Sequence, residues 1–104
     1  MKENVIMRKS LAFSVRIVNL QKYLTEQKKE YVISRQIYKS GTSIGANIAE
    51  AQRAQSTADF VSKMKIALKE ANETQYWLQL LRETEYITDN AFKSIHGDLV
   101  EILR

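Results

Sequence analysis

Small residues recur at every fourth position in the middle of the chain, at Gly41, Gly45 and Ala49. If this segment is helical, the three residues form one ridge, because side chains three and four residues apart share a helix face. Two glycines inside a helix cost about 1 kcal/mol each relative to alanine. Close packing against a neighbouring helix can stabilise the fold enough to offset this cost. The ridge therefore predicts that a second helix lies directly against this segment.

Polar residues crowd the same segment, which otherwise has the hydrophobic pattern of a buried helix. Because buried polar groups are almost always hydrogen-bonded, we expect these side chains to have partners inside the fold. These polar residues are Ser40, Thr42, Ser43, Asn47 and Glu50.

The rest of the chain is typical of an all-α protein. Its 104 residues include no proline and only three glycines, so helix-breaking residues are rare. Apolar residues recur at steps of three and four, most regularly from Phe60 to Leu81. We predict a single domain spanning 1–104, with helices at about 4–26, 30–54, 57–85 and 89–103, and N-caps at Ser56 and Thr88. Four helices with short connections predict an antiparallel up-down four-helix bundle.

The first helix has two apolar stripes on nearly opposite sides. One stripe runs from Phe13 through Ile17 to Leu24 and suits the core of the bundle. A peripheral helix of a monomer needs only one such face, so the second stripe predicts a homo-oligomer. Its residues, the predicted subunit interface, are Leu11, Val15 and Val18.

Glu70 and Glu73 lie in a row of the third helix that otherwise carries large apolar residues. Acids on a packed face usually accept hydrogen bonds from neighbouring donors. We therefore expect Glu50, Glu70 and Glu73 to have structural partners, and general acid–base chemistry is the alternative use of such carboxylates. The candidate partners are Asn47, Arg53, Tyr76 and Trp77.

The sequence offers little support for catalysis. His96 is the one histidine and there is no cysteine. A ferritin-like di-iron site needs a Glu-x-x-His pair on each of two helices, yet no acid lies three residues before His96. The segment from Gly41 to Gly45 lacks the strand and the Gly-Lys-Ser/Thr of a phosphate-binding loop. We expect no enzyme activity, no metal, no cofactor and no small-molecule substrate.

No apolar run approaches the roughly 20 residues that a membrane span requires. The N-terminal residues have charges but no continuous apolar stretch of the kind found in signal peptides. The absence of cysteine fits a reducing compartment. We therefore expect a cytoplasmic protein with no membrane partner.

The net charge of +4 is unevenly distributed along the chain. Residues 1–55 contain ten Lys or Arg and four Glu, whereas residues 56–104 contain six Lys or Arg and eight Asp or Glu. This asymmetry predicts a basic face able to bind phosphates. A solvated charged surface without a partner is the alternative. The candidate nucleic-acid-binding residues are Arg8, Lys9, Arg16, Lys22, Arg35, Lys39 and Arg53.

Residues 40–51 (SGTSIGANIAEA) closely resemble the signature of a bacterial protein family. The similarity continues through residues 59–60 (DF), 66–74 (IALKEANET) and 76–78 (YWL), and the opening residues 7–13 (MRKSLAF) are also similar. Nearly the whole chain is covered, and the resemblance assigns a structural motif to Ser40, Gly41, Ser43, Gly45, Asn47, Glu50, Glu70, Glu73 and Trp77. The family comprises four-helix-bundle proteins encoded within intervening sequences of 23S ribosomal RNA genes, together with their stand-alone relatives.

The resemblance implies an antiparallel four-helix bundle that assembles as a homopentamer. It also implies kinship with the accessory variability protein of diversity-generating retroelements, a basic pentamer that binds nucleic acid and a reverse transcriptase. No catalytic residues are established in the family, so none carry over. The preferred prediction is thus a non-enzymatic, oligomeric bundle that binds RNA or a nucleoprotein partner through a basic surface. The alternative is a purely structural or protein–protein interaction module.

Overall fold

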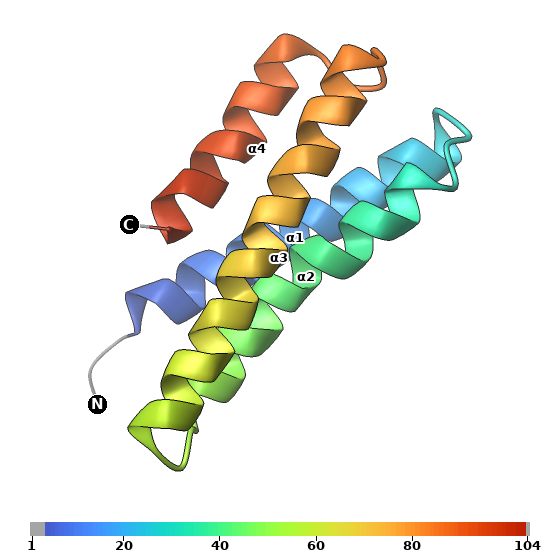
Figure 1. The fold of residues 1–104 in the computed structure, drawn as a ribbon. Helices are drawn as coiled ribbons and strands as arrows, with labels where there is room; N and C mark the ends of the chain where they lie inside the picture. Colours follow the sequence, from blue (N-terminus) through green and yellow to red (C-terminus); the bar gives the residue numbers. More distant parts are fainter. Residues whose placement is uncertain (1–3, 104) are drawn as a thin grey trace.

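The chain folds into four α-helices, shown in Figure 1 from a computed structural model that describes residues 4–103. They are α1 (Val5–Glu26), α2 (Ile33–Gln52), α3 (Thr57–Glu83) and α4 (Asp89–Ile102). Within the described residues every regular element is a helix, so the predicted all-α class is confirmed. Successive helices run in opposite directions, and α2 packs against both α1 and α3, while α4 packs against α1 and α3.

Three helices begin at side-chain caps that the chain carries one position before the helix. The amide of Asp59 donates to Ser56 Oγ over 3.1 Å, and the amide of Ala91 donates to Thr88 Oγ1 over 3.1 Å. Asn4 caps α1 in the same way, by accepting from the amide of Met7. Such caps satisfy backbone donors that have no partner within the helix. The predicted caps at Ser56 and Thr88 are confirmed.

The connection between α1 and α2 is longer than the predicted helix bounds allow, because α2 begins at Ile33 and not near residue 30. Lys29 has a φ of 56°, which turns the chain out of the helix. The carboxylate of Glu30 then accepts hydrogen bonds from the amides of Ser34 (2.7 Å) and Val32 (3.3 Å). Glu30 is 8% exposed and supplies the acceptors for the start of α2. Glu30, which the sequence places at the start of the second helix, thus lies before that helix and has a buried structural role.

The core lies along the inward faces of the four helices. The inward-facing residues of each helix follow the predicted steps of three and four. The start of α3 is less well buried, because α4 does not extend that far: Phe60, in the first turn of α3, is 40% exposed. Figure 1 shows the first turns of α3 extending past the end of α4, next to α2. The buried apolar residues of α1 and α2 are Phe13, Ile17, Leu20, Leu24, Ile37, Ile44, Ile48 and Ala51, and those of α3 and α4 are Ala67, Ala71, Leu78, Leu81, Phe92, Ile95, Leu99 and Ile102.

The small-residue ridge of α2 faces α1, as predicted. A Cβ atom added at Gly41 would lie 2.8 Å from both γ carbons of Ile17, closer than side chains pack. At Gly45 the nearest atom would be Ser14 Oγ at 3.1 Å. On the other side of α2, the buried hydroxyls of Ser40 and Thr74 are hydrogen-bonded over 3.0 Å and link α2 to α3. The ridge therefore sets how closely α1 and α2 approach.

We expect the same Gly→Ala substitution to have different effects at two helical positions. An added Cβ at Gly97, in α4, has no heavy atom within 4 Å, so Gly97→Ala should raise the free energy of unfolding by about 1 kcal/mol through helix propensity. Gly41→Ala gains the same propensity but overpacks Ile17, which costs about 1–3 kcal/mol. Urea denaturation should give Gly41→Ala a free energy of unfolding about 1–3 kcal/mol lower than that of Gly97→Ala. Equal free energies of unfolding would contradict the close contact.

Candidate functional site

Positive charge gathers on the α1–α2 half of the molecule. Helix α1 contains four Lys or Arg and one Glu, and α2 contains two Lys or Arg and one Glu, with Arg53 directly after it. Helix α3 contains four residues of each sign, and α4 contains one Lys and three acids. Because α1 and α2 are neighbours, the basic half of the sequence becomes one side of the fold. Such a side attracts polyanions.

Two of the candidate phosphate-binding residues point toward α4. Lys9 Nζ lies 3.4 Å from Glu101 Oε2, and Arg16 Nη1 lies 2.8 Å from Asp98 Oδ2. All four side chains are partly exposed, so each pair contributes at most about 1 kcal/mol to stability. Their charges are nevertheless balanced locally by the acids of α4. Lys9 and Arg16 therefore add less to the basic side than the sequence suggests.

The other candidate cations are directed to solvent. Lys22 of α1 and Arg35, Lys39 and Arg53 of the α2 segment are exposed, and none forms an ion pair among residues 4–103. Arg35 and Arg53 are 18 residues apart, which is five turns of an α-helix, so they lie in line along one edge of α2. Lys39 follows Arg35 by one turn. Arg8, the seventh candidate, is exposed and lines the groove between α1 and α2.

The predicted subunit interface lies on this same side. Leu11 is 67% exposed and Val15 is 53% exposed, whereas Val18 is half-buried. The opposite stripe of α1 is in the core, so the two-faced character of this helix is confirmed. A hollow of about 530 Å³, named here the apolar hollow, lies next to Leu11. Its walls are Met7, Arg8, Ser10, Leu11 and Ser14 of α1 and Gly45, Ala46 and Ala49 of α2.

The acidic motif residues lie at the surface, contrary to the expectation of a packed face. Glu50 and Glu73 are both exposed, and Glu70 is half-buried. The row of α3 that holds Glu73 is only partly covered, because Glu70 and Trp77 are half-buried and Trp77 packs against the core. Trp77 Nε1 donates to Glu73 Oε2 over 3.3 Å, which confirms one of the expected partnerships.

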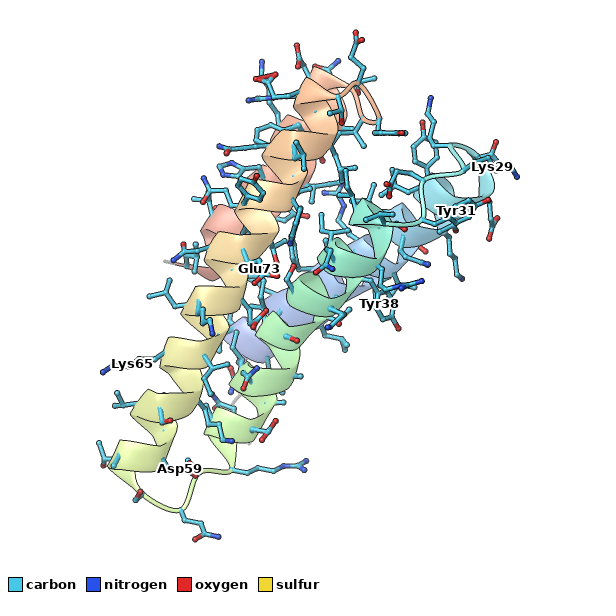
Figure 2. The ribbon with its side chains drawn as sticks, turned by 45° about the vertical axis from the view of Figure 1, so that its right-hand side comes forward. Lys29, Tyr31, Tyr38, Asp59, Lys65 and Glu73 are labelled. Atoms are coloured by element: carbon cyan, nitrogen blue, oxygen red, sulfur yellow. The ribbon has the colours of Figure 1, made fainter. Side chains whose placement is uncertain are left out.

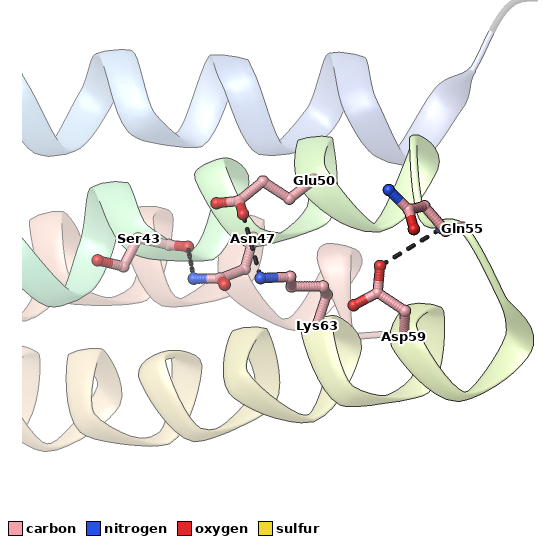
Figure 3. A network of polar contacts seen from close by, with 6 residues as sticks. All are labelled: Ser43, Asn47, Glu50, Gln55, Asp59 and Lys63. Atoms are coloured by element: carbon pink, nitrogen blue, oxygen red, sulfur yellow. Dashed lines mark hydrogen bonds and ion pairs between the residues drawn. The ribbon is translucent and has the colours of Figure 1, made fainter.

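Figure 3 shows the polar contacts that join the end of α2 to the start of α3. Glu50 Oε1 lies 3.2 Å from Lys63 Nζ, a partner that the sequence pattern did not identify. Asn47 Nδ2 donates to the carbonyl oxygen of Ser43 over 2.8 Å, within α2 itself. Ser43 Oγ in turn donates to the carbonyl oxygen of Lys39. These contacts are local to the surface, so they stabilise the helix ends and leave the carboxylates accessible.

Residues 4–103 contain neither a metal-binding cluster nor a membrane span. No three or more His, Asp or Glu side chains of this part of the chain gather where they could bind a metal ion together. None of its four helices has a segment both long enough and apolar enough to cross a membrane.

Comparison with known proteins identifies a family and closely similar solved structures. The family model described as 23S rRNA-intervening sequence protein matches residues 2–104. A crystal structure at 1.70 Å of a protein of unknown function from the S23 ribosomal protein family, from Bacteroides thetaiotaomicron VPI-5482, is 63% identical in sequence. The match covers 98% of this chain and 91% of that one, with a TM-score of 0.94. No curated protein matches.

The burial of the glutamates predicts which of them stabilises the fold. Glu30→Ala removes an acceptor from two backbone amides at the start of α2, so it should lower the free energy of unfolding by about 0.5–2 kcal/mol. Glu73→Ala removes an exposed carboxylate and leaves Trp77 Nε1 free to bond water, so the change should stay within about 0.5 kcal/mol. Urea denaturation of both variants checks the order. A larger decrease for Glu73→Ala would show that its row is buried.

Proposed function

The chain belongs to the 23S rRNA-intervening sequence protein family, and from that premise we propose that it is a non-enzymatic, cytoplasmic, homo-oligomeric protein that binds RNA. The α1–α2 side is the proposed binding surface. The observation that carries the proposal is the row of exposed cations along α2, namely Arg35, Lys39 and Arg53, which lack acidic partners among the described residues. Cations with no protein partner are free to contact phosphates.

The proposed binding mode is led by the RNA backbone. Arginine and lysine contacts to phosphate supply affinity that is independent of sequence and falls with added salt. One chain offers few such contacts, and its net charge is only +4. A homo-oligomer repeats the row in every subunit, so many phosphates are contacted together. Oligomerisation thus makes a modest charge per chain sufficient for RNA binding.

The proposed assembly uses the exposed stripe of α1 and the apolar hollow beside it. Leu11 and Val15 are large apolar side chains that the protomer leaves mostly in water. Burying each of them would contribute about 1.5–3 kcal/mol, and the hollow offers a concave surface with small residues on its α2 wall. The resemblance noted from the sequence implies five copies, and we propose a pentamer on that basis.

Charge reversal on α2 should weaken RNA binding more than the same change on α3. Arg35→Glu with Lys39→Glu replaces two cations one turn apart, and Lys65→Glu with Lys69→Glu makes the matched change on exposed lysines of α3. The α2 variant should bind structured RNA at least tenfold more weakly. It should also make the plot of log K against log salt less steep, by about 0.7–0.9 for each phosphate that the variant no longer neutralises.

A fluorescence anisotropy titration at several salt concentrations measures both quantities. The α3 variant should bind like the parent protein. Equal weakening by the two variants would point to a general effect of net charge and not to a binding surface. If the folded, oligomeric parent protein binds no RNA at low salt, a structural or protein-interaction module replaces the proposal.

The proposed interface predicts a change of mass on substitution. Light scattering should give the parent protein about five times the 12.0 kDa of one chain. Leu11→Glu places a charge at the centre of the stripe, which is costly to bury, so the assembly should dissociate. Val32→Glu makes a similar change at a 72% exposed position of the α1–α2 loop and should leave the mass unchanged. A parent protein that is monomeric at micromolar concentration would contradict the assembly.

A further inference from the structure

A second hollow lies at the other end of the groove between α1 and α2. It has a volume of about 280 Å³, and it is walled by Gln21 and Thr25 of α1, Tyr31 of the α1–α2 loop, and Ser34, Arg35 and Tyr38 of α2. Figure 2 marks Tyr31 beside Lys29 at the end of the molecule where α1 connects to α2, and Tyr38 farther along α2. We name it the tyrosine hollow. In contrast to the apolar hollow, it combines two aromatic rings with a cation.

Thr25 Oγ1 of this hollow donates to the carbonyl oxygen of Gln21 over 3.0 Å, whereas the two phenols and the guanidinium have no polar partner among residues 4–103. Tyr31 is 56% exposed and Tyr38 is 43% exposed, and neither phenol forms a hydrogen bond with any residue in 4–103. The guanidinium of Arg35 makes no ion pair there. The nearby acid Glu30 is occupied by the backbone of α2. Two exposed rings and an unpaired guanidinium therefore face the same open space.

We propose that the tyrosine hollow binds an unpaired base of RNA, which stacks on Tyr31 and Tyr38 while Arg35 contacts an adjacent phosphate. The inference rests on the proposed RNA-binding function and names the part of the surface that recognises bases. Aromatic side chains beside a basic groove are the usual elements of single-strand binding, because every base has a face that can stack. At about 280 Å³ the hollow is at the small end of ligand pockets, which suits one planar base.

Further cations lie near the hollow but outside its walls. Lys39 follows Arg35 by one turn of α2, Lys22 of α1 lies three residues before Thr25, and Lys29 lies in the adjoining loop; all three lysines are exposed. Lys28 of the same loop instead lies over the ring of Tyr23, with Nζ 5.9 Å from the ring centroid. Lys22, Lys29 and Lys39 would contact the phosphates on either side of a stacked base. Their charge favours a nucleic acid over an uncharged aromatic ligand.

The tyrosine hollow lies beyond the most exposed residues of the proposed subunit interface. Leu11 of the apolar hollow and Gln21 of the tyrosine hollow are ten residues apart on α1, or about 15 Å, while Val18, the half-buried end of the interface stripe, lies three residues before Gln21. A neighbouring subunit docked on Leu11 and Val15 that ends at Val18 would leave the tyrosines open to RNA. The groove therefore divides into an apolar end for assembly and an aromatic end for a base.

A stacking site distinguishes single-stranded RNA from duplex RNA. Bases in an A-form duplex are already stacked, and they are reached only through the groove edges. The protein should therefore bind an unstructured oligonucleotide or a loop more tightly than a duplex of equal charge. The preference should be largely independent of base identity, because stacking tolerates all four bases.

Substitution of the tyrosines tests the site. Tyr31→Ala with Tyr38→Ala should weaken binding of an unstructured 12-nucleotide RNA by about 5- to 150-fold for each base that no longer stacks. Tyr31→Phe with Tyr38→Phe keeps both rings and should bind like the parent protein. Tyr76→Ala removes a tyrosine of matched exposure (57%) on α3 and should have no effect. Circular dichroism and light scattering confirm that each variant is folded and assembled.

Two further measurements separate stacking from charge. Binding to a 12-base-pair RNA duplex should change less than twofold in the double alanine variant, since its cations are intact. A 2-aminopurine base in the single strand should lose fluorescence on binding the parent protein, and the double alanine variant should abolish this quenching. Parent-like single-strand affinity in the double alanine variant, or an equal decrease for duplex and single strand, would overturn the stacking site alone. A parent protein that binds neither RNA would overturn the proposed function as well.

Discussion

The contact between Gly41 of α2 and Ile17 of α1 sets the geometry on which the rest of the structure depends. Without a side chain at Gly41, the γ carbons of Ile17 occupy the space where a Cβ would lie. The two helices are therefore held close together over the middle of their length. Farther along, Gly45 and Ala49 are too small to fill the outer groove, and the apolar hollow is the result. One packing constraint thus creates both the core of the α1–α2 pair and the surface features beside it.

Because α1 packs against α2, the uneven distribution of charge along the sequence becomes an uneven distribution of charge over the surface. The basic first half of the chain forms α1 and α2, and the more acidic second half forms α3 and α4. Where the halves meet, the acids of α4 balance Lys9 and Arg16. The cations on the outer side of α2 have no such neighbours. In the proposed function, assembly through the apolar end of the groove and RNA binding through its basic, aromatic end would use the two parts of one surface.

Sequence patterns predicted the helices and the core well, because steps of three and four report directly on buried helix faces. The caps at Ser56 and Thr88 and the facing of the Gly41 ridge were predicted for the same reason, since each depends on local spacing. Sequence patterns did not predict the burial of individual polar side chains, because that depends on how the helices and loops pack together. Glu30 is charged and follows two lysines, yet it is buried as the acceptor at the start of α2. Glu73 lies among apolar residues, yet its side chain is exposed. Tyr31 and Tyr38 meet in one hollow only because α2 begins after a turn at Lys29.

Photo-crosslinking of bound RNA to the protein, followed by mass spectrometry of the linked peptides, tests the central claim most directly. The account places RNA on the α1–α2 side, so crosslinks should fall within residues 8–53. Tyr31 and Tyr38 should be the linked tyrosines among the five in the chain. Crosslinks that concentrate on α3 or α4, for example at Tyr76, would contradict the assignment of the α1–α2 side as the RNA-binding surface.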